Sequence, residues 1–162
     1  MDIRAMKSQI DSDTIMVYTS YPNYPYGTVD DVHQIAKICR KKKTPMHIDM
    51  CLGGFIVPFL QNGKGDSMLE IPEGTTSISL DPHKYGLAAK GSSIVLYSDE
   101  RIQREQFFTT DKWPGGLYAT PTISGSRSGA PIASTWISIM KIGVNGFTQN
   151  AKNVQSGNLK NK

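Results

Sequence analysis

The sequence is poor in cysteine and has no long apolar run. Its two cysteines, Cys39 and Cys51, are too few for a disulfide framework and lack the spacing of a metal site. No apolar stretch reaches the roughly 18 residues that cross a membrane, and residues 1–10 lack the apolar core of a signal peptide. These absences predict a soluble chain in a reducing compartment, without a bound metal.

Acidic residues are only slightly fewer than basic residues. The 162 residues carry 18 Lys and Arg against 14 Asp and Glu, and much of the basic excess lies at residues 40–43. Such a cluster usually marks the solvated end of a helix, so nucleic acid is not an expected partner. A hydrophobic content of 38% suffices for one globular domain, and 15 Gly with 9 Pro predict many turns between short elements.

The first half of the chain predicts a strand, a helix and a second strand. Residues 14–18 and 45–50 are short β-prone runs. Between them, Asp30 is a candidate N-cap for an amphipathic helix. The apolar positions of this helix follow the i, i+3, i+4, i+7 spacing and are Val32, Ile35, Ala36 and Cys39. Two strands joined by a helix should be parallel, with a right-handed crossover.

The second half adds strands and one more helix. The patterns predict a polar loop, two strands and a last amphipathic helix, over residues 64–73, 75–80, 92–97 and 126–142. Gly143 should end that helix, and a frayed tail should follow from Ala151. Strands that alternate with helices predict an α/β fold with a mainly parallel sheet, whose ligands bind where the strands end.

Several polar side chains follow the ends of the expected strands. Asp49 ends the second strand, Ser20 follows the first, and His83 and Lys84 follow the third, so all should converge on one edge of the sheet. A nucleophilic lysine needs a lowered pKa, and Lys84 has an apolar strand before it and His83 beside it. A lysine that forms a Schiff base and a carboxylate for a pyridinium nitrogen are what pyridoxal phosphate chemistry requires.

Five linked motifs make a resemblance specific. They are HIDMCLGGF, SLDPHKYG, KGSS, GGLY and GSRSG, at residues 47–55, 79–86, 90–93, 115–118 and 125–129. In order and spacing they resemble the sphingosine-1-phosphate lyases, members of the pyridoxal-phosphate-dependent group II decarboxylases. The resemblance implies a pyridoxal-phosphate-dependent transferase fold of type I, and this chain would form the second half of its large domain.

The same resemblance implies a division of the chain and a cofactor site. Residues 1–12 would be a polar segment, residues 13–147 part of the cofactor-binding large domain, and residues 148–162 a polar tail. The implied site roles are as follows: Lys84 holds pyridoxal 5′-phosphate as a Schiff base, Asp49 pairs with the pyridine nitrogen, Cys51 packs against the ring, His83 contacts the phosphate, and Ser20 hydrogen-bonds near the ring.

Further residues are implied at the substrate end. Gly116 and Tyr118 would approach the phosphate across a subunit interface, Tyr118 and Arg127 would bind substrate, and Arg127 would act as an anion clamp. The sequence departs from the family in two places. Tyr18 and Thr19 precede Ser20 where a Gly-Ser pair is usual, and Tyr26 replaces a histidine.

The implied reaction is a retro-aldol cleavage of sphingosine 1-phosphate to a long-chain aldehyde and phosphoethanolamine. Lys84 or a nearby tyrosine would return the proton to C2, and the sequence does not choose between them. The resemblance also implies a homodimer at the cytosolic face of the endoplasmic reticulum membrane, held by an N-terminal anchor that these residues do not contain. Two alternatives stay open: a pyridoxal-phosphate-dependent amino-acid decarboxylase, and a non-catalytic fragment that acts as an interaction module.

Overall fold

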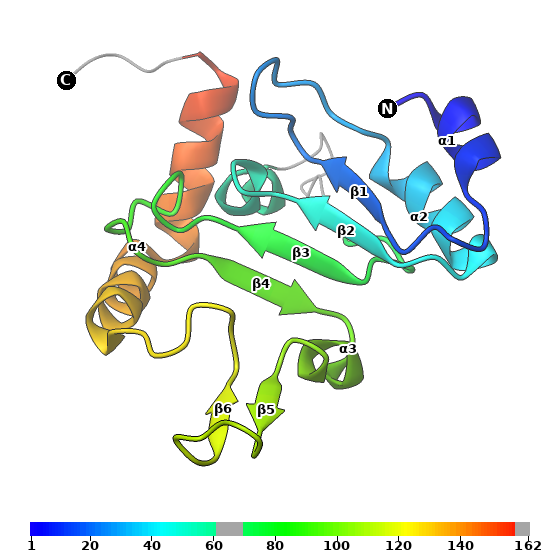
Figure 1. Ribbon diagram of the computed structural model, residues 1–162. Helices are drawn as coiled ribbons and strands as arrows, with labels where there is room; N and C mark the ends of the chain where they lie inside the picture. Colours follow the sequence, from blue (N-terminus) through cyan, green and yellow to red (C-terminus); the bar gives the residue numbers. More distant parts are fainter. Residues whose placement is uncertain (61–69, 158–162) are drawn as a thin grey trace.

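A mixed sheet organises the computed structural model, which describes residues 1–60 and 70–157 (Figure 1). Its strands are β1 (Val17–Ser20), β2 (Met46–Asp49), β3 (Ser77–Leu80) and β4 (Ile94–Tyr97), in the spatial order β1-β2-β3-β4. Strands β1, β2 and β3 are parallel, and β4 runs antiparallel to β3. The expected α/β fold with a mainly parallel sheet is confirmed.

Helix α2 (Val32–Lys42) connects β1 to β2. Its N-cap is Asp31, whose side chain accepts a hydrogen bond from the Gln34 amide, and Lys43 ends it in the left-handed conformation. The expectation that Asp30 caps this helix is wrong by one residue. The carboxylate of Asp30 instead accepts the backbone N–H of Ser20, which ties the loop after β1 to the start of the helix.

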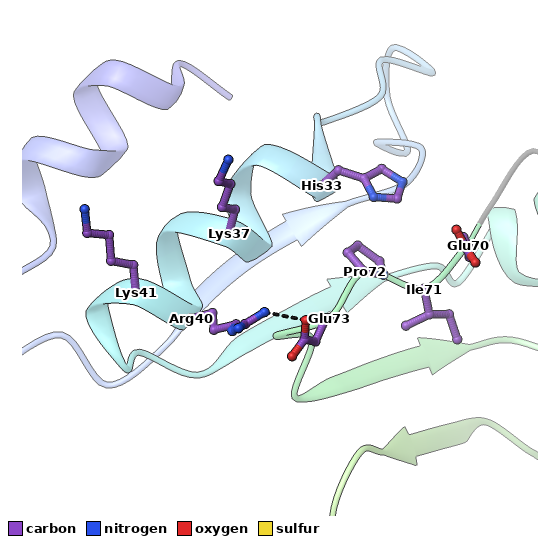
Figure 2. Close-up of a pocket in the computed structure, with 8 residues that line it drawn as sticks. All are labelled: His33, Lys37, Arg40, Lys41, Glu70, Ile71, Pro72 and Glu73. Carbon is purple, nitrogen blue, oxygen red and sulfur yellow. Dashed lines mark hydrogen bonds and ion pairs between the residues drawn. The ribbon is translucent and has the colours of Figure 1, made fainter.

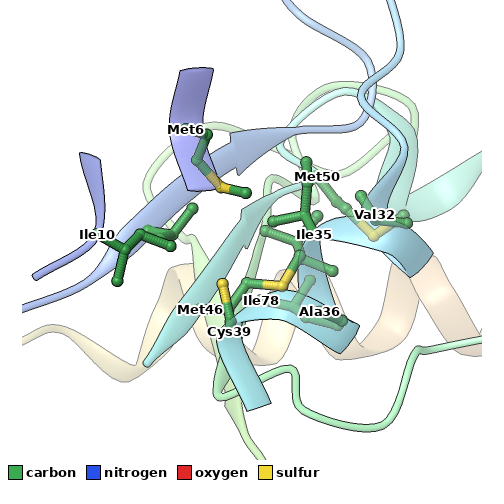
Figure 3. Close-up of a cluster of buried hydrophobic side chains, with 11 residues drawn as sticks. Met6, Ile10, Val32, Ile35, Ala36, Cys39, Met46, Met50 and Ile78 are labelled. Carbon is green, nitrogen blue, oxygen red and sulfur yellow. The ribbon is translucent and has the colours of Figure 1, made fainter. Parts of the chain in front are cut away.

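One face of the sheet is covered by α1 (Ile3–Gln9) and α2, and the core lies there (Figure 3). The buried cluster consists of Met6, Ile10, Val17, Val32, Ile35, Ala36, Cys39, Met46, Ile48, Met50 and Ile78. Its strand members occur at every second position, as a strand half-covered by helices requires. Burial of this apolar cluster stabilises the sheet with α1 and α2 and holds the parallel strand ends in register.

The opposite face of the same strands carries polar and aromatic side chains. Alternate positions of β1, β2 and β3 present Tyr18, His47, Asp49, Ser77 and Ser79 on that side. The side chains from β2 and β3 are half-buried, and Tyr18 is 52% exposed. This second face ends at the edge where β1, β2 and β3 terminate, so its polar groups lie next to the expected site.

The remaining elements lie beyond the sheet. They are η1 (Gly53–Phe55), η2 (Val57–Phe59), α3 (Glu100–Arg104), β5 (Phe108–Thr110), β6 (Tyr118–Thr120) and α4 (Gly129–Gln155). Strands β5 and β6 form an antiparallel hairpin of their own. Phe147 of α4 packs its ring at 5.5 Å from Phe55 and 5.1 Å from Phe59, which attaches α4 near the end of β2.

Three expectations are corrected at the ends of the chain. Residues 1–12, expected only as a polar segment, contain a helix, because Asp2 caps α1 and Met6 and Ile10 are buried in the core beside α2. Gly143 breaks the helical geometry of α4 but does not end it, since the helix continues and buries Phe147 and Ala151. The tail is therefore helical as far as Gln155, where fraying was expected.

Two remaining observations concern the loop and the membrane. Residues 64–69 of the expected polar loop lie outside the described residues. Across residues 1–60 and 70–157, the structure contains no helix with the length and apolar character that a membrane crossing needs.

Candidate active site

The carboxyl ends of β1, β2 and β3 bring together the central residues of the expected site. Ser20 and Asp49 end β1 and β2 and are register partners. The turn after β3 carries His83 and Lys84, and Cys51 lies just beyond Asp49. The Cys51 side chain interacts with both the Asp49 carboxylate and the Lys84 amine, so the expected convergence of Asp49 and Lys84 is found.

Asp49 is held by hydrogen bonds to both carboxylate oxygens. Its Oδ1 accepts the Cys51 backbone N–H at 2.9 Å and the Ser79 hydroxyl at 3.3 Å, and its Oδ2 accepts the Tyr18 hydroxyl at 2.8 Å. Burial raises the pKa of the Asp49 carboxyl, but the bonds from Cys51, Tyr18 and Ser79 outweigh burial and bring the pKa below its usual value. Asp49 is therefore ionised at neutral pH.

Lys84 is paired with a carboxylate from its own turn. Its Nζ lies 3.0 Å from Oδ2 of Asp81, and the side chain is 29% exposed. The Ser93 hydroxyl donates to the other oxygen of Asp81 at 2.6 Å and so orients that carboxylate. Cys51 raises the pKa of the Lys84 amine, burial opposes this, and Asp81 raises it further, with a net rise. The expected lowering of the Lys84 pKa is wrong for this structure, because Cys51 and Asp81 together favour the charged amine.

Cys51 lies close to both Asp49 and Lys84. It is partly buried, and burial raises the pKa of its thiol; Asp49 adds to that rise while Lys84 opposes it. The thiol is therefore protonated at neutral pH and is a small apolar side chain between an amine and a carboxylate.

A polar network behind Asp49 was not expected from the sequence. Nδ1 of His47 lies 2.8 Å from the Ser77 hydroxyl, and Nε2 lies 3.2 Å from the hydroxyl of Ser79, which also donates to Asp49. The Tyr18 ring stacks on the His47 ring at 5.1 Å. Burial lowers the pKa of His47, so its imidazole is neutral at pH 7. The period-2 pattern of polar residues in the three strands was the signal that would have found this network.

Ser20 and His83 lie at the same edge, in structural contacts of their own. The Ser20 backbone N–H donates to Asp30, and Nδ1 of His83 is 3.3 Å from the carbonyl oxygen of Ser92. These bonds fix the backbone around the site. The expected roles of both residues toward a cofactor remain predictions.

The hairpin that carries Tyr118 lies apart from the edge that carries Asp49, whereas Arg127 lines an open cavity together with Ser92 and Ser93, next to the turn that carries Lys84. Figure 1 places the β5–β6 hairpin to one side of the sheet, beyond β4 and away from the ends of β1, β2 and β3. Tyr118 and Arg127 do line one open cavity of about 380 Å³. The expected roles of Gly116, Tyr118 and Arg127 remain predictions.

The solvent face of α2 carries another open cavity, of about 780 Å³ (Figure 2). Its lining includes His33, Lys37 and Lys41, together with Arg40, which pairs with Glu73. The cavity lies between the exposed flank of α2 and residues 70–73 (Figure 2), and opposite charges line it. It does not contribute to the site at the strand ends.

Comparison with known proteins places the chain in a family. A model described as the pyridoxal-dependent decarboxylase conserved domain matches residues 5–158. Sphingosine-1-phosphate lyase 1 of Rattus norvegicus is 45% identical over 159 residues, which are 95% of this chain and 28% of that protein. Sphingosine-1-phosphate lyase of Dictyostelium discoideum is 43% identical over 157 residues, 95% of this chain and 30% of its own. The chain thus spans less than a third of the length of these curated relatives.

Solved structures agree on the fold. The sphingosine-1-phosphate lyase of Burkholderia pseudomallei superposes with a TM-score of 0.86 at 36% identity, over 95% of this chain and 36% of that one. The glutamate decarboxylase of Lactobacillus brevis superposes with a TM-score of 0.75 at 22% identity, over 96% of this chain and 36% of that one. The second likeness concerns the fold alone.

Proposed function

The chain belongs to the pyridoxal-dependent decarboxylase family, and we propose that it is the lysine- and aspartate-bearing part of an enzyme that cleaves phosphorylated sphingoid bases. The single observation that carries the proposal is the placement of Asp49, Cys51 and Lys84 at the carboxyl edge of the parallel strands. The likeness to lyases of that name supports the choice of substrate class.

The donor set at this edge fits pyridoxal phosphate, the cofactor of this family. The cofactor needs a primary amine for covalent attachment and a carboxylate for its pyridine nitrogen, and Lys84 and Asp49 would supply them, each close enough to Cys51 to influence the pKa of its thiol. When bound, pyridoxal phosphate supplies an electron sink for the bond that breaks. Cys51 would pack against its ring, and His83 and Ser20 would contact its phosphate and ring.

Asp49 would hold a proton on the pyridine nitrogen. A carboxylate with a lowered pKa remains charged, and a charged acceptor favours the protonated form of a basic nitrogen beside it. The hydrogen bonds from Cys51 and Ser79 to Oδ1 fix the orientation of the carboxylate, so that no reorganisation is needed at the moment of reaction.

Lys84 would attach the cofactor and then move protons. Its amine is charged beside Asp81, so attachment requires that Nζ loses a proton and leaves that carboxylate. Asp81 is oriented by Ser93 to receive the amine again once the substrate has replaced it. The ion pair would thus give Lys84 a defined resting place close to the reacting atoms.

The proposed reaction breaks the C2–C3 bond of a phosphorylated sphingoid base and releases a long-chain aldehyde and phosphoethanolamine. The substrate phosphate would need a cation, which Arg127 would provide as an anion clamp, while Gly116 and Tyr118 would approach the cofactor phosphate from a second copy of the chain. We therefore propose a homodimer, with the complete enzyme anchored at the cytosolic face of the endoplasmic reticulum membrane. The segment that would anchor it lies outside these 162 residues.

The test uses the full-length protein that contains these residues, loaded with pyridoxal phosphate. Borohydride reduction followed by peptide mapping should place the cofactor on Lys84, and a label on Lys90 would overturn the assignment. Product analysis separates the alternatives. Aldehyde release from a phosphorylated sphingoid base supports the proposal, carbon dioxide release from an amino acid supports a decarboxylase, and the absence of both with no bound cofactor supports a non-catalytic module.

A further inference from the structure

We propose that Tyr18 is a positioning residue, whose hydroxyl fixes Oδ2 of the Asp49 carboxylate. The inference deepens the proposed function and rests on the role given there to Asp49. Tyr18 stands where the resemblance provides no counterpart, because the sequence departs from the family at this point.

The strand register brings Tyr18 to Asp49. Tyr18 pairs with His47 across β1 and β2, and Ser20 pairs with Asp49 two positions later. Tyr18 and Asp49 are therefore diagonal neighbours on one face of the sheet, a separation of about 7–8 Å that an aromatic side chain spans. The Tyr18 side chain spans that separation, and its hydroxyl donates to Oδ2 of Asp49 at 2.8 Å.

The stacking of the Tyr18 ring on His47 holds the Tyr18 side chain in place. The Tyr18 ring stacks on His47 with an interplanar angle of 27°, and the His47 imidazole is held at both nitrogens by Ser77 and Ser79. Both ends of the Tyr18 side chain are thus positioned, although half of its surface is exposed. A phenol on such a support loses little further conformational freedom when it hydrogen-bonds.

The hydrogen bonds divide between the two oxygens of Asp49. Cys51 and Ser79 donate to Oδ1, and Tyr18 donates to Oδ2. The titratable groups that interact with the carboxylate are Tyr18 and His47 on its own face and Cys51 at the strand end, with Lys84 beyond Cys51. Since His47 is neutral at pH 7, none of the described residues places a cation directly against Oδ2, and the Tyr18 hydroxyl supplies the stabilisation there.

The Tyr18 hydroxyl stays protonated wherever the enzyme works. Burial and the Asp49 carboxylate raise the pKa of Tyr18 to about 12. It is a hydrogen-bond donor, and not a base, throughout the physiological range. Removal of the hydroxyl should therefore shift the protonation of Asp49 to higher pH.

The decisive variant is Tyr18→Phe, which keeps the ring on His47 and removes only the hydroxyl. The matched control is Tyr97→Phe. Tyr97 lies in the same cross-strand row, paired with Ser77, but its hydroxyl donates to the neutral side chain of Gln106 at 2.9 Å. A merely structural contribution of a phenol hydroxyl would affect both variants alike.

The first measurement needs no cofactor. In the full-length apoprotein with ¹³C-labelled aspartate, the infrared difference between wild type and Asp49→Asn isolates the Asp49 carboxyl. Its protonation curve should move to higher pH in Tyr18→Phe and stay in place in Tyr97→Phe. An unchanged Asp49 curve in Tyr18→Phe overturns the proposal, whatever the activity of the protein.

The second measurement separates this proposal from the proposed function. In the loaded enzyme, Tyr18→Phe should lower kcat on the order of tenfold, about the effect of one hydrogen bond to a charged group, with little change in KM. It should also alter the pH dependence of the cofactor absorbance. If Asp49→Asn leaves that absorbance unchanged, the role of Asp49 in the proposed function fails while the link between Tyr18 and Asp49 stands.

Discussion

Replacement of Gly53 by alanine tests whether the loop after β1 is packed against the turn after β2. A Cβ on Gly53 would lie 2.1 Å from the carbonyl oxygen of Tyr21 and 3.0 Å from Cδ of Pro22. Real Cβ contacts essentially never fall below 3.0 Å, so the two segments must separate by close to 1 Å or more. The obstructing atom is a backbone oxygen, and the N–H of Tyr21 donates to the carbonyl oxygen of Asp49 at 2.8 Å. A displacement of Tyr21 would therefore strain the backbone at Asp49, at the end of β2.

Overpacking of this kind costs about 1–3 kcal/mol, and a backbone obstacle favours the upper half of that range. In the full-length protein, Gly53→Ala should lower the midpoint of thermal unfolding by several degrees and weaken cofactor binding. Gly54→Ala should cost less, because its closest obstacle is Cδ2 of Leu80, the end of a flexible side chain. Gly129→Ala is the control, since its Cβ meets nothing within 4 Å at the start of α4. Equal unfolding midpoints for Gly53→Ala and Gly129→Ala would refute the packing argument.

The remaining predictions concern the site and the isolated chain. Asp49→Asn should retain bound pyridoxal phosphate but lose several powers of ten in kcat, on the order of 4 kcal/mol or more in the barrier, and near-normal turnover would remove Asp49 from the mechanism. Lys84→Ala should leave no cofactor that borohydride can fix to the protein, and a mass spectrum that still carries the adduct would contradict this. The 162-residue chain alone should bind pyridoxal phosphate weakly and cleave no substrate, because it would supply only part of the cofactor-binding domain and each charge-assisted bond to the phosphate is worth about 1.5–3 kcal/mol. Turnover by that chain, checked for homogeneity by gel filtration, would show that this part suffices.

Local sequence patterns predicted the centre of the fold well. The segment from β1 through α2 to β2 has strong periodicity, and the helix cap lies within one residue of the expected one. The reason is that the buried positions from Val32 to Cys39 recur at helical spacing within one short stretch of sequence. The ends of the chain were different. Helix α1 is short and gains its stability by burying Met6 and Ile10 on α2, and such a helix has little local signal.

The second half of α4 shows the same limit of local patterns. Gly143 adopts φ 61° and breaks the helical geometry, as a helix-ending glycine does. The chain nevertheless resumes the helix, because Phe147 packs between Phe55 and Phe59 from a distant part of the sequence. The stop signal was local, and the contact that overrides it is tertiary.

The sequence by itself determined the α/β class, the family resemblance, and the presence of Asp49 and Lys84 at the ends of parallel strands, because strand ends and motif spacings are local properties. Only the tertiary structure decided how these groups are tuned. Cross-strand register placed the hydroxyls of Tyr18 and Ser79 within hydrogen-bonding distance of Asp49. The turn after β3 brought Lys84 to Cys51 and Asp81, which together raise the pKa of the amine. Electrostatic effects depend on distances between residues far apart in the chain, and those distances exist only after the strands have paired.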